Sequence, residues 1–267
     1  MQQHLEKLVA PVVNIAEKAS DAILEIYNSE DFGVETKDDE SPLTLADKAS
    51  HNVIVAELAA LTPDIPILSE ESRTVAWETR SQWDEYWLID PLDGTKEFIK
   101  RNGEFTVNIA LVQGHKAVLG VVHVPVQQRC FYGYQGGGSF EKNTAGEIRS
   151  IHATEQARNP VRVVGSRSHR GELLDAYLER LGEHEMVPMG SSLKLCLVAL
   201  GEADVYPRLG LTSEWDTAAA QAVVECAGGK VVQTSGSPLL YNAKEDILNP
   251  FFIVYGDHSR DWTSYLE

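Results

Sequence analysis

The sequence predicts an N-terminal α+β half, residues 1–155, followed by a C-terminal α/β half, residues 156–267. In the first half, after the first helices, short apolar runs are separated by gaps of hairpin length, which favours antiparallel pairing. In the second half, apolar runs of strand length alternate with helical patterns. At 267 residues the chain is long enough for one large domain or two smaller ones.

Two helices and a short strand are expected first. Residues 4–27 carry apolar side chains at spacings of three and four, which indicates an amphipathic helix. Thr44 or Asp47 could cap a second helix, and capping alone would explain Asp47. The apolar strand 66–69 then ends at Glu70. An acid at a strand end is usually a solvated surface group, so Glu70 becomes a ligand candidate only beside other acids.

The most informative stretch follows the apolar run 86–89. We expect this strand to end at Asp90 because Pro91 has no N–H to donate, while Gly94 permits a sharp turn with exposed N–H groups. Asp90 and Asp93 would then lie beside an anion-binding nest. At about 4 Å apart they would repel by roughly 4 kcal/mol, which a cation or a proton would relieve. Hard oxygen ligands favour Mg²⁺, whereas the alternative is an ordinary surface turn.

The remaining elements follow in order. One helical turn is expected at 96–99, then strands at 105–112, 117–124 and 130–134, and the triple glycine 136–138 is interpreted as a loop, since it lacks the Lys-Ser/Thr of a P-loop. In the second half, strands are expected at 161–164, 203–206, 230–233 and 251–255, and helices at 172–181, 191–200 and 215–227.

Asp216 lies at the start of the helix expected at 215–227. A capping role, or a favourable interaction with the helix dipole, is sufficient to explain an acid there. Asp216 is a metal ligand only if the two halves of the chain bring it onto the Asp90 turn.

The bulk composition excludes several functions. A net charge of −17 argues against nucleic-acid binding, and it means that metals and a few cations must reverse the charge around an anionic substrate. The longest apolar runs are too short to span a bilayer and no signal peptide is visible, so we expect a cytoplasmic protein. Cys130, Cys196 and Cys226 are odd in number and have apolar neighbours, so reduced thiols are expected.

Three motifs together resemble the signatures of the inositol monophosphatase superfamily, in the same order and at matching separations. They are Glu70 in Leu-Ser-Glu-Glu-Ser, the stretch Asp90–Thr95, and Trp215-Asp216, and the match spans nearly the whole chain. The resemblance implies a layered αβαβα sandwich with the active site between the two halves. It also implies that two to three Mg²⁺ ions are held by Glu70, Asp90, Asp93, Asp216 and the Leu92 carbonyl.

The resemblance further implies direct attack by water, without a phosphoenzyme. Asp47, hydrogen-bonded to Thr95, would orient or deprotonate that water, with Glu70 as a further catalytic residue. The N–H groups of Gly94 and Thr95 would hold the phosphate oxygens. The motifs contain no cysteine or histidine, which favours direct hydrolysis over covalent catalysis. Substrate contacts are expected from Glu70, Leu92, Asp93, Gly94, Thr95, His169, Ser191, Lys194, Arg208 and Asp216.

The Lys-Glu-Phe-Ile that follows Thr95, together with Gly190–Lys194, resembles the branch of the superfamily that acts on 3′(2′),5′-bisphosphate nucleotides. This implies hydrolysis of the 3′-phosphate of adenosine 3′,5′-bisphosphate, a by-product of sulfate activation, to AMP and phosphate. Lithium inhibition is implied as well. Ser191, Lys194 and Arg208 would meet the second phosphate and the nucleotide, and His169 the base or a phosphate. Lys194 could equally snorkel from its helix, and Arg208 and His169 could be ordinary surface or structural residues.

Other functions stay open at this point. The scaffold would also suit an inositol-1-phosphatase or a sugar bisphosphatase, and activity on phosphoadenylyl sulfate is undecided. A non-catalytic protein that binds Mg²⁺ and phosphate is the alternative from a different class, although the presence of Asp47, Asp93 and Thr95 argues against it. A homo-oligomer and a peripheral association with the inner membrane are also undecided.

Overall fold

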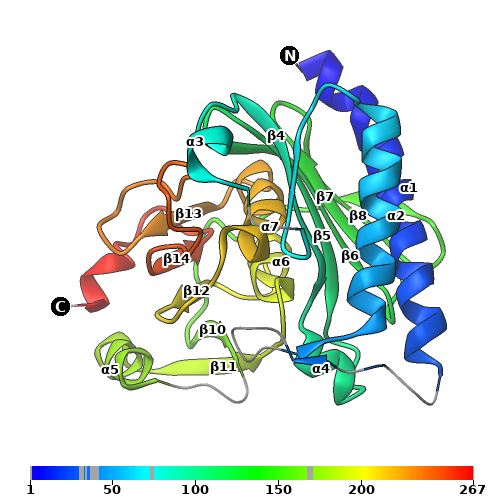
Figure 1. Ribbon diagram of the computed structural model, residues 1–267. Helices are drawn as coiled ribbons and strands as arrows, with labels where there is room; N and C mark the ends of the chain where they lie inside the picture. Colours follow the sequence, from blue (N-terminus) through cyan, green and yellow to red (C-terminus); the bar gives the residue numbers. More distant parts are fainter. Residues whose placement is uncertain are drawn as a thin grey trace.

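A computed structural model describes residues 2–29, 33, 35–36, 42–72, 75–166 and 171–266. Helices and sheets alternate in five layers (Figure 1). A pair of helices covers a seven-stranded sheet, two further helices lie between that sheet and a five-stranded sheet, and one helix covers the far side. The αβαβα sandwich expected from the sequence is confirmed.

The outer helix pair consists of α1 (Gln2–Tyr27) and α2 (Leu45–Leu61), which lie side by side on one face of the large sheet (Figure 1). Thr44 is the N-cap of α2: its Oγ1 accepts a hydrogen bond from the Ala46 N–H, and its own N–H donates to Asp47 Oδ2. Just before α2, β1 (Glu35–Thr36) and β2 (Pro42–Leu43) form a small antiparallel ribbon. Across the described ranges, no helix is both long and apolar enough to cross a membrane.

The large sheet is antiparallel except for its first pair of strands, β3 and β4, which run parallel. The antiparallel pairing predicted for the strands at 105–112, 117–124 and 130–134 is therefore confirmed. The last two strands were not predicted, and Gly138 begins one of them, so the interpretation of 136–138 as a loop is wrong at that residue. In spatial order the strands are β3 (Ile67–Ser69), β4 (Glu85–Asp93), β5 (Thr106–Gln113), β6 (Lys116–Val124), β7 (Arg129–Tyr134), β8 (Gly138–Lys142) and β9 (Ile148–Ser150).

The small sheet is mixed and contains one strand, β11, that the sequence did not predict. In spatial order its strands are β11 (His184–Pro188), β10 (Val161–Gly165), β12 (Val205–Arg208), β14 (Phe252–Tyr255) and β13 (Lys230–Gln233). The helices of this half are α5 (Glu172–Leu181), α6 (Leu193–Ala199), α7 (Glu214–Cys226) and the 3₁₀ turn η1 (Thr263–Leu266), while the first half also contains the short helices α3 (Trp77–Arg80) and α4 (Thr95–Ile99).

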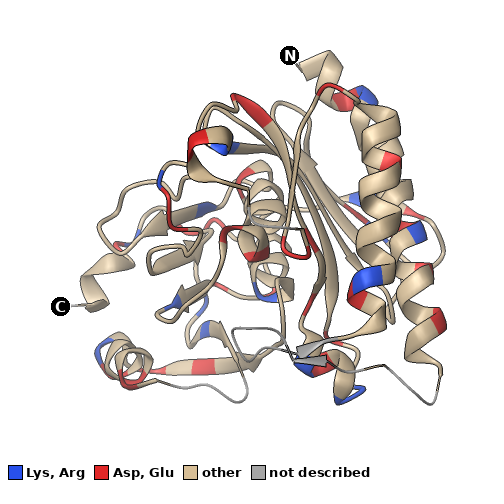
Figure 2. Cartoon of the chain, viewed as in Figure 1, with Lys and Arg blue, Asp and Glu red and all other residues tan. Residues whose placement is uncertain are grey.

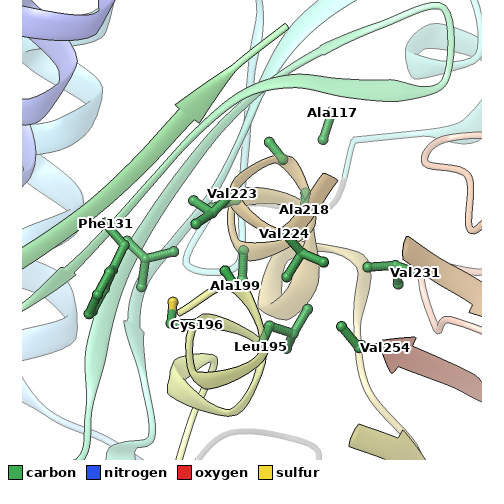
Figure 3. Packing of buried hydrophobic residues seen from close by; sticks show 14 of the residues in the cluster. Ala117, Phe131, Leu195, Cys196, Ala199, Ala218, Val223, Val224, Val231 and Val254 are labelled. Carbon is green, nitrogen blue, oxygen red and sulfur yellow. The ribbon is translucent and has the colours of Figure 1, made fainter. Parts of the chain in front are cut away.

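One hydrophobic core joins the two sheets through α6 and α7. Figure 3 shows Val223 and Val224 of α7 between Phe131 of the large sheet and Val231 and Val254 of the small one. The predicted boundary near residue 155 falls between β9 and β10, where the chain passes from one sheet to the other. The division into two domains at that point stays a prediction.

Two glycines allow α7 to lie unusually close to the large sheet. A Cβ atom on Gly120 of β6 would be 2.0 Å from the carbonyl oxygen of Ala219, and one on Gly133 of β7 would be 3.0 Å from the Cβ of Cys226. Any larger side chain at Gly120 would therefore have to push the helix away. The position of α7, and of everything at its first turn, depends on this glycine.

All three cysteines are free thiols, as the sequence predicted. Cys130 and Cys196 are fully buried and Cys226 is half-buried. Burial raises the pKa of each thiol, so these side chains act as core residues and not as reactive groups.

We predict that Gly120→Ala destabilises the protein by about 1–3 kcal/mol or more, because the added methyl group would overlap the backbone of α7. Urea unfolding measures the change in the free energy of unfolding. Gly171→Ala is the matched control, since a Cβ there meets nothing within 4 Å. Equal stabilities for the two variants would contradict the close packing of α7.

A second prediction concerns His123 of β6, which is buried and whose Nδ1 lies 2.7 Å from Ser20 Oγ of α1. Burial lowers the pKa of His123 to about 4. The imidazole of the unfolded chain, with a pKa near 6.5, therefore takes up its proton at a higher pH than the folded protein does. Stability from the neutral imidazole is complete above pH 6.5 and is lost as the pH falls toward 4.

Between pH 7 and pH 5 this loss amounts to about 2 kcal/mol. We expect wild-type protein to lose that much more stability than His123→Asn, in which no imidazole titrates but a polar group stays near Ser20. Urea unfolding of both proteins at the two pH values tests this. A parallel decline in both proteins would show that His123 does not couple to folding in this range.

Candidate active site

The site is built on an irregularity in β4. The strand does not end at Pro91, as the sequence suggested, but continues to Asp93. Asp90 pairs with Asn108 of β5 and Asp93 pairs with Thr106, so β4 has one residue more than its partner between these pairs. This is a β-bulge, a position where a proline is tolerated because the regular ladder is interrupted.

The bulge places two carboxylates on the same face of the sheet. Side chains alternate along a strand, so Asp90 and Asp93 would point to opposite faces without the extra residue. With it, both face α7, while Leu92 packs on the opposite side with the residues that meet α1 and α2. The Leu92 N–H also donates to Asp90 Oδ1 at 3.0 Å, which fixes that carboxylate.

A third and a fourth carboxylate arrive from other elements. Glu70 follows β3, which runs parallel to β4, and its N–H donates to the Ile89 carbonyl. Asp216 lies in the first turn of α7, where its Oδ2 accepts the Ser213 N–H at 2.9 Å. One carboxylate oxygen each of Glu70, Asp90 and Asp216 lies within 4.8 Å of the other two. The fold thus brings Asp216 onto the Asp90 turn.

This arrangement is electrostatically strained. Burial raises the pKa of Asp90 well above its usual value, and the charges of Glu70, Asp93 and Asp216 add to the increase. Asp216 behaves in the same way, with burial first and then the charges of Asp93 and Glu70. A cluster of converging carboxylate oxygens with raised pKa values fits a hard divalent cation. The donor set is therefore suited to Mg²⁺.

Asp93 links this cluster to a cavity of about 190 Å³. Its Oδ2 accepts the Ser192 N–H at 2.5 Å. Asp93, Asp216 and Glu97 contribute negative charge to the cavity wall, and the opposing positive charges come from Lys96, Lys194 and Arg208. Figure 2 shows that lysines and arginines are otherwise dispersed over the elements in this view.

Two of these cations are held in place by the protein. Lys194 is buried, with its Nζ donating to the Ser191 carbonyl at 2.5 Å and lying 5.7 Å from the centre of the Tyr206 ring. It therefore does not snorkel to the surface. Burial lowers the pKa of Lys194 to about 8, although the Asp93 charge opposes the shift. Arg208 donates hydrogen bonds to Thr212 Oγ1 and to the Leu211 carbonyl, which fix its guanidinium at the cavity.

The pair proposed to act on water is also present. Thr95 Oγ1 donates to Asp47 Oδ1 at 3.3 Å, while Asp47 Oδ2 accepts the hydrogen bonds of Thr44 at the start of α2. Gly94, with a φ of 99°, turns the chain between β4 and α4, a conformation that favours glycine. His169, also proposed as a substrate contact, lies outside the described residues.

The structure adds three residues that the sequence did not single out as site residues. Lys96 follows Thr95 directly in the central motif and lines the cavity, so its position in the motif was an available signal. Ser192, inside the motif Gly190–Lys194, meets Asp93 from a loop, and Asn108 meets it from β5, where nothing in the local sequence indicates it. Their role depends on which segments the fold places side by side.

Comparisons with known proteins agree with this geometry. The inositol monophosphatase family matches residues 4–257. The 3′(2′),5′-bisphosphate nucleotidase CysQ of Salmonella typhimurium is 50% identical over 248 residues, which cover 92% of this chain and 99% of that protein. The protein of the same name from Haemophilus influenzae is 37% identical over 263 residues, covering 98% and 97% of the two chains.

A solved structure gives the same result. The crystal structure of CysQ from Bacteroides thetaiotaomicron, described as a bacterial member of the inositol monophosphatase family, matches with a TM-score of 0.83 and 41% identity, over 96% of this chain and 98% of that one. The sequence match spans nearly the whole chain, and the fold agrees with it. The chain belongs to the inositol monophosphatase family.

Proposed function

We propose that this protein is a Mg²⁺-dependent 3′(2′),5′-bisphosphate nucleotidase that hydrolyses adenosine 3′,5′-bisphosphate to AMP and phosphate. The main observation is a cluster of carboxylates, Glu70, Asp90 and Asp216, one of which, Asp216, also lines a cavity where Lys96, Lys194 and Arg208 are among the described lining residues. The name of the relative at 50% identity supports the same substrate class. Such an enzyme would recycle the nucleotide by-product of sulfate activation.

Glu70, Asp90 and Asp216 would hold the metal, with Asp93 and the Leu92 carbonyl as further ligands for a total of two to three ions. Bound Mg²⁺ supplies positive charge for the phosphoryl oxygens and increases the acidity of water. The protein's part is to fix the carboxylates, through the Leu92 N–H at Asp90 and the Ser213 N–H at Asp216.

Asp47, hydrogen-bonded to Thr95, would orient or deprotonate the attacking water. The capping bonds of α2 fix the Asp47 carboxylate, so Oδ1 is held toward Thr95 and can accept a proton there. Glu70 belongs to the same carboxylate cluster and would assist in orienting the water. The N–H groups of Gly94 and Thr95 would hold phosphate oxygens at the turn.

The second phosphate of the substrate would be recognised by Lys96, Lys194 and Arg208, with Ser191 beside them. A guanidinium and two ammonium groups form strong charge-assisted hydrogen bonds with a phosphate, whereas the hydroxyl groups of an inositol ring offer no such charge. The same cations thus favour a bisphosphate over inositol 1-phosphate. His169 stays proposed as a further contact, and activity on phosphoadenylyl sulfate stays open.

We predict faster phosphate release from adenosine 3′,5′-bisphosphate than from inositol 1-phosphate. EDTA should abolish the activity, and Asp93→Asn should reduce it by at least roughly 100-fold because a metal carboxylate is lost. A colorimetric phosphate assay measures both substrates. A preference for inositol 1-phosphate would overturn the proposed substrate, and activity that survives EDTA would overturn the proposed metal. No hydrolysis of either ester, by a protein that binds Mg²⁺, would favour the binding-protein alternative.

We predict that Lys96→Gln lowers kcat/KM for adenosine 3′,5′-bisphosphate roughly 10- to 150-fold, the effect of losing one charge-assisted hydrogen bond. Activity on adenosine 3′-monophosphate, which has no second phosphate, should stay within about twofold. Lys100→Gln is the matched control, since Lys100 is also exposed and terminates the same short helix outside the cavity. Equal losses on both nucleotides would assign Lys96 to the reacting phosphate or to structure.

A further inference from the structure

One buried amide beside the carboxylates has no evident structural function. Asn108 lies on β5 opposite Asp90 and is 1% exposed. Among the described residues its Nδ2 makes no hydrogen bond of regular length and angle, although the amide is near enough to act on the Asp93 carboxylate. A buried donor without a partner costs about 1–3 kcal/mol, so the fold retains this group at a loss unless it acts on something in the site.

The other end of the amide is firmly held. Asn108 Oδ1 lies 2.9 Å from Ser192 Oγ and 3.2 Å from Thr106 Oγ1, and the two hydroxyl groups are 2.8 Å apart. One hydroxyl donates to the other, and the second donates to the amide oxygen. These bonds occupy the carbonyl oxygen and leave the amino group directed away from the hydroxyls. The flipped amide would expose its oxygen to the carboxylates instead, which electrostatic repulsion disfavours.

The free donor is close to Asp93. The bulge puts Asp93 and Asp90 on the face of the sheet that Asn108 and Thr106 share. The groups that stabilise the Asp93 carboxylate are the Lys194 ammonium, the Ser192 N–H and the Asn108 amide. Ser192 therefore contacts both residues. Its N–H donates to Asp93, and its hydroxyl group orients Asn108.

We propose that Asn108, oriented by Ser192 and Thr106, is a positioning residue that fixes the Asp93 carboxylate for the divalent cation. This inference rests on the metal site of the proposed function. The amide and the Ser192 N–H restrict rotation of a half-buried carboxylate that would otherwise turn toward Lys194. Loss of such an outer partner of a metal ligand typically weakens metal affinity 10- to 100-fold.

Calorimetric titration of the metal-free full-length protein with Mg²⁺ tests this proposal. We expect Asn108→Leu, which has a similar volume and no donor, to bind Mg²⁺ roughly 10- to 100-fold more weakly than wild type. Ser192→Ala removes the orienting hydroxyl but keeps the backbone N–H at Asp93, so a smaller loss of roughly threefold to tenfold is expected. In both variants the Mg²⁺ concentration for half-maximal phosphatase activity should rise by a similar factor.

Ser139→Ala is the matched control. It removes a buried hydroxyl that donates to the Tyr132 carbonyl on the same sheet, away from the site. Its Mg²⁺ affinity should equal that of wild type even where its melting temperature is lower. A residue with a purely structural role at position 108 would likewise lower the melting temperature and leave the Mg²⁺ affinity unchanged.

The outcomes separate the two proposals. Wild-type protein that binds no Mg²⁺ would overturn the metal site of the proposed function, and this inference with it. Wild type that binds Mg²⁺ while folded Asn108→Leu binds it equally well would overturn the role of Asn108 alone. If Asn108→Leu does not fold, the Mg²⁺ affinity of Ser192→Ala tests the proposal instead. An affinity equal to that of wild type would then overturn the proposed orientation of the amide by Ser192.

Discussion

The structure depends on holding together carboxylates that repel one another. Oxygens of Glu70, Asp90 and Asp216 lie within 4.8 Å of each other, and Asp93 adds its charge. Each pair at about 4 Å opposes folding by roughly 4 kcal/mol at an effective dielectric of 20. The raised pKa values of Asp90 and Asp216 show that proton uptake would relieve part of this repulsion. A bound cation would remove most of this opposition, and the surrounding core must supply the rest.

The fold meets this demand by fixing each acid from outside the cluster. Asp47 and Asp216 are both the third residue of a helix and accept the N–H of its cap, so the bond that starts each helix also orients a carboxylate of the proposed site. The bulge turns Asp93 to the face of Asp90, and Gly120 lets α7 approach that face closely. Catalytic geometry and elementary helix and sheet structure are therefore the same set of interactions.

This overlap explains how much the sequence could predict. Long periodic segments such as α1 leave local signals, and so do Glu70 and Asp90, which follow apolar runs. Asp216, at a helix start, was joined to them only by the family resemblance. The strand through Pro91 could not, because a bulge depends on the partner's register and not on propensity. β9 is exposed along its length and therefore lacks an apolar pattern. Asn108 and Ser192 matter only through what the fold places beside them, which no local pattern records.

The balance of acidic and basic side chains in the cavity suggests that a bound metal cation would also attract the substrate. Among the described residues, three acidic and three basic side chains line it, so these side chains alone supply no excess of positive groups for a phosphate ester. The chain's overall charge of −17 repels an anion at long range, although salt screens that repulsion beyond about 8 Å. A cation held by the carboxylates would supply the positive excess. Substrate affinity and metal occupancy are therefore coupled, and residues that only position the carboxylates act on substrate binding without touching the substrate.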